Sequence, residues 1–146
     1  MEWIEALRGS TVGLDTGPLI YYIEENPDFL HKIKPFFEAA DRNEFQIVTS
    51  FVTLLEVLVL PLREGRLELA REYREILLRS HALTAIPLDE GIAELAAGLR
   101  ARHNLRTPDA IQVATAIRSG ATWFLTNDSD FENLPDISVL VLKKLP

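Results

Sequence analysis

The sequence predicts an α/β fold in which helices cover both faces of a mainly parallel sheet. Short runs rich in β-branched and aromatic residues alternate with longer segments of helical periodicity along the chain. A helix between two strands makes a crossover connection, which joins parallel strands. No linker, internal repeat or low-complexity segment interrupts this alternation, so we expect all 146 residues to form one domain.

Five short apolar runs are predicted to be strands. The Gly17-Pro18 pair after the first run is typical of a turn from strand into helix, because proline at a first helical position loses no hydrogen bond. The predicted strands are Thr11–Leu14, Phe45–Thr49, Leu83–Pro87, Thr122–Thr126 and Ser138–Leu142.

Helical periodicity fills the segments between these runs, and Met1–Ser10 is a helical or irregular lead-in. Ser50 and Thr107 are predicted N-caps of the helices that follow them. Pro35 is expected to bend or divide its helix. The first predicted helix begins near Pro18 and ends at Asn26-Pro27, and the second begins at Asp28. Three further helices span Phe51–Leu60, Arg63–Ser80 and Asp89–His103, and the last begins at Thr107-Pro108-Asp109.

The segment Phe51–Leu60 is apolar almost all round, which predicts a buried helix. Glu56 lies within it. A buried carboxylate costs several kcal/mol unless it is paired or bound to a cation. We therefore expect Glu56 to have a positive partner.

The segment Arg63–Ser80 has the pattern of an amphipathic helix. Its apolar stripe consists of Leu67, Ala70, Tyr73 and Leu77. Four arginines lie outside that stripe, and we interpret them as a solvated face, with RNA contact as the alternative. They are Arg66, Arg71, Arg74 and Arg79.

The composition narrows the classes of function. The chain has no cysteine, which excludes disulfides, thiolate zinc sites and cysteine nucleophiles and leaves oxygen atoms as the main metal ligands. A net charge of −7 argues against capture of nucleic acid by a basic surface. No export signal is present, and the apolar run Val48–Leu62 is shorter than the ~20 residues of a membrane span. We expect a cytoplasmic protein without membrane contact.

Four acids occupy positions that can meet at one edge of the sheet. Asp15 and Asp128 follow strands, Asp109 begins a helix, and Glu56 lies in the apolar helix. Ligands of parallel α/β sheets bind at the carboxyl ends of the strands. Converging carboxylates match the preference of Mg²⁺ or Mn²⁺ for oxygen ligands.

Two of these acids also have a purely structural interpretation. Asp15 can cap the helix that begins near Pro18. Asp109 can interact with the dipole of its own helix. Both interpretations stay open for the single residues, and the hypothesis of a site depends on the four acids together.

Four segments carry a resemblance to a known family, in this order: Leu14–Ile20, Thr53–Glu56, Thr107–Ile111 and Phe124–Phe131. With these segments the chain resembles the PIN-domain family and, within it, the VapC-type toxin ribonucleases. The resemblance implies a Rossmann-like α/β/α sandwich around a mainly parallel sheet. It also implies a single PIN domain over residues 1–146, with residues 1–10 as an amino-terminal extension.

The resemblance implies a quartet of acids that holds one or two Mg²⁺ or Mn²⁺ ions, namely Asp15, Glu56, Asp109 and Asp128. Asp130 matches a frequent fifth acid of the family, or alternatively caps the turn at Phe131. Thr16 and Thr126 match small polar residues that support the acids by hydrogen bonding.

The implied activity is hydrolysis of RNA phosphodiester bonds. The metal would lower the pKa of a bound water and neutralise charge on the phosphate. Asp15, Asp109 and Asp128 would mainly hold metal, whereas Glu56 would bind metal or orient the water. The VapC resemblance further implies a toxin that a small antitoxin holds inactive, and a homodimer.

The same residues also bear on other functions. A non-catalytic PIN-fold RNA-binding or scaffold module would not need all four acids, whereas a housekeeping RNA-processing nuclease would. A phosphoacceptor receiver domain needs an acid pair beside its first strand, where Asp15 is single, and a lysine near its last strand, where Lys143 lies too close to the end. A haloacid-dehalogenase-type phosphatase needs a second Asp where Gly17 stands.

Overall fold

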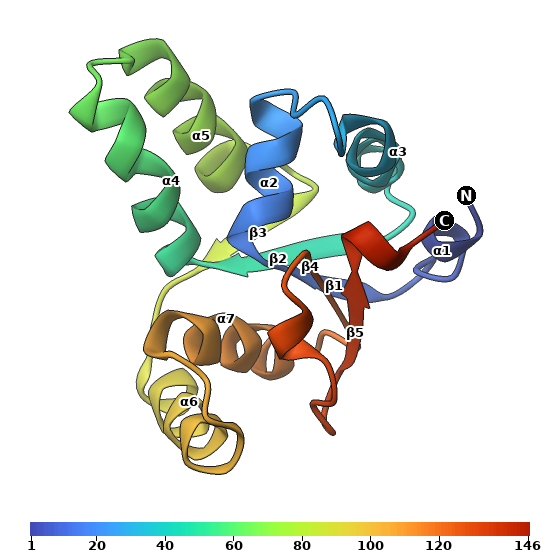
Figure 1. Ribbon diagram of the computed structural model, residues 1–146, viewed down its shortest axis with the longest axis vertical. Coiled ribbons are helices and arrows are strands. Elements are labelled where there is room, and N and C mark those ends of the chain that lie inside the picture. Colours follow the sequence, from blue (N-terminus) through green and yellow to red (C-terminus); the bar gives the residue numbers. More distant parts are fainter.

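A five-stranded parallel sheet forms the centre of the computed structural model, which describes residues 1–146 (Figure 1). Every neighbouring pair of strands is parallel. The first strand of the chain therefore lies in the middle of the sheet, and the predicted α/β fold is confirmed. In spatial order the strands are β3 (Leu83–Ile86), β2 (Gln46–Ser50), β1 (Thr11–Leu14), β4 (Trp123–Thr126) and β5 (Ser138–Val141).

Helices cover both faces of the sheet, each over its own hydrophobic core (Figure 1). On one face lie α1 (Glu2–Glu5), α2 (Thr16–Ile23), α3 (Leu30–Asp41), α4 (Phe51–Arg63) and α5 (Leu67–Arg79). On the other face lie α6 (Glu90–His103) and α7 (Thr107–Arg118). Two short 3₁₀ helices, η1 (Ser129–Phe131) and η2 (Leu142–Lys144), follow β4 and β5. No helix is both long enough and apolar enough to span a bilayer.

The segment before β1 contributes to the core. Trp3, Ile4 and Leu7 are buried, and the Trp3 ring stacks on Phe36 of α3 with 6.0 Å between ring centroids. These residues close the core at the end of the sheet opposite the candidate site, since β1 begins next to them and ends at the acids.

Two helices pass through a proline. α3 runs unbroken from Leu30 to Asp41 with Pro35 inside it, so the division predicted there does not occur. α4 likewise continues past Pro61 to Arg63, three residues beyond the predicted end at Leu60. Each proline removes one N–H donor, and the packing of the rest of the helix on the core compensates for that loss.

The predicted helix Arg63–Ser80 begins later than expected. Gly65 has φ +70°, in the left-handed region, and ends α4 before α5 begins at Leu67. Glycine adopts this conformation without strain, which is why it commonly terminates helices. Ala70, Tyr73 and Leu77 of the predicted stripe are buried, whereas Leu67 at the helix start is exposed.

The prediction that the Phe51–Leu60 helix is buried was wrong. α4 buries one stripe, Thr53, Val57 and Pro61, against the core. Its opposite side is exposed, with Leu55 at 65%. The helix packs through one side only, so uniform apolarity does not mean uniform burial. We call the exposed apolar side the α4 stripe, which consists of Phe51, Leu55, Val59 and Leu62.

Candidate functional site

Asp15 stands at the carboxyl end of the central strand and binds two neighbours. It is the N-cap of α2, and its Oδ1 accepts a hydrogen bond of 2.9 Å from the Thr16 N–H. Its Oδ2 accepts a second, of 2.7 Å, from the hydroxyl of Thr126 at the end of β4. Asp15 therefore does cap the helix, as the structural interpretation expected, and it also faces the neighbouring strand.

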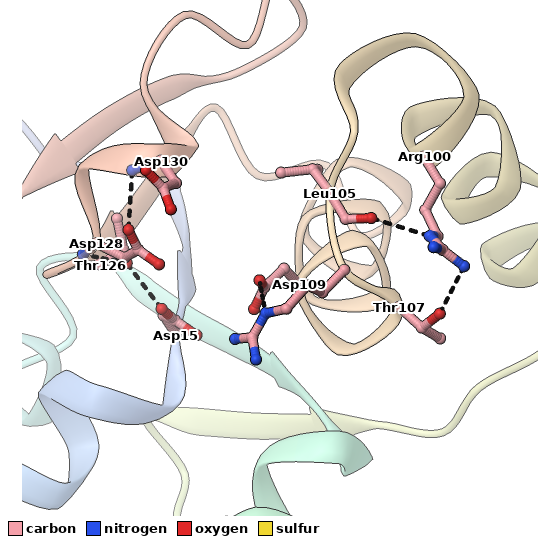
Figure 2. Close-up of polar contacts among 9 residues, drawn as sticks. Asp15, Arg100, Leu105, Thr107, Asp109, Thr126, Asp128 and Asp130 are labelled. Atoms are coloured by element: carbon pink, nitrogen blue, oxygen red, sulfur yellow. Dashed lines mark hydrogen bonds and ion pairs between the residues drawn. The ribbon is translucent and has the colours of Figure 1, made fainter.

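Thr126 links Asp15 to the acids that follow β4 (Figure 2). Its Oγ1 accepts a 3.0 Å hydrogen bond from the Asp128 N–H while its proton goes to Asp15. The Asp128 Oδ1 in turn accepts a 2.9 Å bond from the Asp130 N–H and caps η1. The cap of this turn is thus Asp128, not Asp130, and the exposed Asp130 side chain lies beside Asp128 (Figure 2).

Glu56 reaches the same edge of the sheet from α4. Its Oε1 accepts a 2.7 Å hydrogen bond from the Thr16 hydroxyl, which joins α4 to the start of α2. Glu56 is exposed, which corrects the expectation of a buried carboxylate with a positive partner. The reason is the one-sided packing of α4, which leaves Glu56 on the solvent side next to the α4 stripe.

Asp109 lies in the first turn of α7, across from Asp15 (Figure 2). Its Oδ2 is 3.1 Å from the Nε of Arg106, with the two side chains 19% and 78% exposed respectively. The predicted Thr107 cap was wrong. The N-cap residue is Arg106 and makes no side-chain cap, while the Thr107 hydroxyl accepts a hydrogen bond of 2.9 Å from Arg100.

The electrostatics of the site centre on Asp15. Burial raises the pKa of its carboxyl, hydrogen bonds from Thr126 and Thr16 oppose that effect, and the neighbouring carboxylates of Asp109 and Glu56 raise the pKa further. Three acids far apart in the sequence are therefore close enough to interact. Asp128 joins them through Thr126.

The donor atoms at this edge suit a hard divalent cation. No three Asp, Glu or His side chains lie close enough together to form a metal-binding group by themselves. Mg²⁺ does not require such a cage, since it keeps several waters and binds through one or two carboxylates plus substrate phosphates. All donors are oxygens, and the carboxylates of Asp109 and Glu56 raise the pKa of Asp15, so a bound cation would offset the repulsion on Asp15. Arg106, which pairs with Asp109, is the one basic side chain in an ion pair with these three acids.

The arginines of α5 do not belong to this edge. Arg66 and Arg79 approach Glu64 and Glu75 at 3.9 and 3.5 Å, and these side chains are largely exposed. This arrangement agrees with a solvated face.

Sequence reasoning missed a layer of polar side chains beneath the acids. Gln112, Thr49 and Thr53 are buried between α7, β2 and α4, and hydrogen bonds connect them to Thr16. One signal was available, because Gln112 is a lone amide in the apolar run Ala110–Ala114. Arg106 was also missed, since its contact with Asp109 depends on the local geometry of the helix start.

Several solved structures share the fold of this chain. Mycobacterium tuberculosis VapC20, described as a sarcin-ricin loop cleaving toxin, superposes with a TM-score of 0.70 at 18% identity, over 89% of this chain and 98% of that one. VapBC2 from Rickettsia felis, bound to a promoter DNA fragment, gives 0.69 at 19% identity over 89% and 97%. A toxin–antitoxin complex from Klebsiella pneumoniae gives 0.66 at 26% identity over 90% and 96%.

Sequence comparison identifies the family. No curated protein sequence matches the chain significantly. The family model of the PIN domain, however, matches residues 12–137. This span contains β2, β3, β4 and all but the first residue of β1, ends just before β5, and includes every acid of the candidate site. The chain therefore belongs to the PIN domain family.

Proposed function

We propose that this chain is a divalent-metal-dependent endoribonuclease and the toxin of a VapBC-type toxin–antitoxin pair. The observation that carries the proposal is that Asp15, Asp109 and Glu56 come together at the carboxyl edge of the sheet, where the carboxylates of Asp109 and Glu56 repel that of the buried Asp15. Such repulsion destabilises the fold, and its retention is understandable if the acids serve a bound cation. Membership of the PIN domain family supports the same conclusion.

Mg²⁺ or Mn²⁺ is the proposed cofactor. Asp15, Asp109 and Asp128 would hold it, with Glu56 as a further ligand or as the group that orients the attacking water, and Asp130 as a fifth acid. When bound, the cation would stabilise the negative charge that develops on the attacked phosphate.

The remaining side chains of the edge would position the acids and the substrate. Thr126 holds Asp15 and the backbone of Asp128 in a fixed relation, and Thr16 holds Glu56. The exposed Arg106 next to Asp109 would contact the RNA backbone, since a guanidinium donates well to phosphate. A local contact of this kind is compatible with a net charge of −7.

We also propose protein partners, namely a small antitoxin and a second copy of the chain, and a single cytoplasmic domain over residues 1–146. The exposed α4 stripe supports a protein partner, because contiguous apolar surface of this kind usually marks an interface. The R. felis and K. pneumoniae structures of similar fold are toxin–antitoxin complexes, which supports an antitoxin.

Cleavage of end-labelled RNA by the purified chain tests the nuclease. We expect cleavage with Mg²⁺ or Mn²⁺ and none in excess chelator. Asp15→Asn and Asp109→Asn should each lower the rate about 100-fold or more, at or beyond the loss seen when a partner of a metal ligand is removed. Glu75→Gln on α5 is the matched control and should cleave normally. Undiminished cleavage by the Asp15 and Asp109 variants would refute the proposal.

Expression in cells tests the toxin. We expect the chain alone to stop growth, Asp128→Asn to be harmless, and co-expression of a short open reading frame next to the gene to restore growth. Sequencing of RNA ends after induction, with wild type beside Asp128→Asn, would identify the target RNA. Cleavage in vitro without any effect on growth would instead indicate a housekeeping nuclease.

A further inference from the structure

A buried amide is connected to Glu56 through the hydroxyl of Thr16. Gln112 of α7 is only 2% exposed. Its Nε2 donates to the hydroxyls of Thr53 at 2.6 Å and Thr16 at 3.2 Å. Its Oε1 accepts from the Ser50 N–H at 3.4 Å and lies 3.4 Å from the Thr49 hydroxyl oxygen. A buried side chain with all its polar atoms engaged at the boundary of three elements is held in one orientation.

The direction of the amide follows from its backbone partner. The Ser50 N–H can only donate, so the group that faces it must be the amide oxygen. The Nε2 group consequently faces Thr53 and Thr16, and it can only donate to them.

The single proton of each hydroxyl then has one consistent destination. Thr49 donates to the Leu14 carbonyl at 2.7 Å, so in the 2.8 Å pair between Thr49 and Thr53 the donor is Thr53. Thr53 has thereby used its proton and accepts from Gln112. Thr16 also accepts from Gln112, which leaves the Thr16 proton for the Glu56 carboxylate at 2.7 Å.

We propose that Gln112 is a positioning residue, which orients the Glu56 carboxylate by holding the Thr16 hydroxyl with its lone pair toward the amide and its proton toward Glu56. The proposal rests on the proposed nuclease function, in which Glu56 binds metal or orients the water.

Glu56 depends on this relay because it has no other anchor. Its side chain is exposed, and the bond from Thr16 is the one hydrogen bond or ion pair that it makes. Without Gln112, the Thr16 proton has a second acceptor within reach, since the Thr53 oxygen lies at 3.2 Å and has lost its amide donor. The Glu56 carboxylate then samples several rotamers in solvent.

Single-turnover and steady-state cleavage of a short RNA test the relay. Gln112→Met keeps the length of the side chain and removes the amide. We expect kcat to fall about tenfold, which is in the range for loss of a group that supports a metal ligand. We expect KM to change less than about twofold. Thr115→Val is the matched control, because Thr115 is buried on the same helix and bonds only the Ile111 carbonyl. It should cleave like the wild type.

A double-mutant cycle separates positioning from general damage. In a Glu56→Ala background, Gln112→Met should have no further effect on kcat, because the group it orients is absent. A full tenfold loss in that background, or no loss in the Gln112→Met single variant, would overturn the proposal. Thr16→Val should reproduce the defect and Thr16→Ser should restore it, which keeps the test informative even if Gln112→Met folds poorly.

A readout without catalysis distinguishes failure of this proposal from failure of the proposed function. We expect the side-chain order of Glu56, measured by ¹³C relaxation in NMR, to be high in the wild type and in Thr115→Val and to drop in Gln112→Met and Thr16→Val. If the wild type cleaves no RNA but Glu56 responds in this way, the function is wrong and the positioning holds. Unchanged Glu56 order in Gln112→Met would refute the positioning by itself.

Discussion

Gly13 of β1 lies so close to Ala116 of α7 that a Cβ built on Gly13 would be 2.4 Å from the Ala116 Cβ. The same Cβ would be 2.9 Å from a ring carbon of Phe124 on β4. Real Cβ atoms do not approach this closely, so glycine at this position lets the helix rest directly on the central strand. The contact sets the height of α7, and with it the positions of Asp109 and Gln112, above the sheet.

Gly13→Ala should therefore destabilise the protein. We expect a loss of about 1–3 kcal/mol in the free energy of unfolding, as for other overpacked cores, measured by urea denaturation. Gly17→Ala is the matched control, because its new Cβ would be 3.6 Å from the nearest atom, the Tyr21 hydroxyl oxygen, and should be tolerated. Adding Ala116→Gly to Gly13→Ala should recover part of the loss. Equal stability of the Gly13 and Gly17 variants would contradict this account.

Asp15→Asn should stabilise the metal-free protein at neutral pH although it slows the proposed cleavage reaction. Burial raises the pKa of Asp15 above 3.8, so the native state holds the proton more tightly than the unfolded chain does. The stability that this group contributes is complete below about pH 4 and is lost as pH rises through the raised native pKa. Above that range the ionised carboxylate opposes folding, and asparagine carries no charge.

Urea denaturation in chelator between pH 4 and pH 8 measures this effect. The free energy of unfolding of Asp15→Asn should exceed that of the wild type most at pH 8, and the difference should shrink toward pH 4. Glu75→Gln, which changes an exposed acid by the same atoms, should show no such trend. A constant difference between Asp15→Asn and the wild type at all pH values would be the opposite of what we expect.

Arg106→Gln should tighten binding of Mn²⁺ with little effect on stability. The pair with Asp109 is exposed on the arginine side, and exposed ion pairs contribute roughly 0–1 kcal/mol. Removal of Arg106 frees an Asp109 oxygen and takes a positive charge away from the proposed cation site. Titration with Mn²⁺, followed by electron paramagnetic resonance, reports the affinity. Arg79→Gln, which removes an exposed ion pair on α5, should leave it unchanged.

Tyr73→Phe should remove part of the loss of stability at high pH. Tyr73 is buried in α5 and donates a hydrogen bond to Glu24. Burial, followed by the bond to Glu24, raises the pKa of the phenol. The contribution of Tyr73 to the free energy of unfolding is thus complete below the pKa of about 10 that tyrosine has in an unfolded chain. It decreases above that pH, since the unfolded chain releases the proton more easily.

Denaturation of Tyr73→Phe at pH 7 should show a loss of about 1 kcal/mol for the missing hydrogen bond. Between pH 9 and pH 11 the difference from the wild type should narrow. Parallel curves over that range would mean that Tyr73 does not control the alkaline transition.

The layout of the fold could be predicted because its signals are local. Each strand is a short apolar run next to a turn or cap, and Ser50 caps α4 as its residue type suggests. Asp15 and Asp128 were expected at strand ends and lie there, because an acid directly after a strand of a parallel sheet has only one edge at which to emerge.

What the sequence could not predict depends on neighbours in space. The apolar pattern of α4 shows how much apolar surface the helix has, but not whether other parts of this chain cover that surface. Leu55, for example, is exposed. The partners of Gln112 are 59 and 96 positions away in the chain, so no local pattern could reveal the relay. Gly65 is a residue type that commonly ends helices, but the amphipathic pattern around it predicted one continuous helix over Arg63–Ser80.

The central place of β1 has a consequence for biosynthesis. β1 pairs with β4 through contacts such as Val12 with Trp123, so β1 lacks its second neighbour until β4, far later in the chain, has been synthesised. Sheets with such long-range pairing fold slowly. The acid cluster therefore cannot assemble on a nascent fragment that ends before β4, and the cation site that we propose is complete only after β4 and the acids that follow it have left the ribosome.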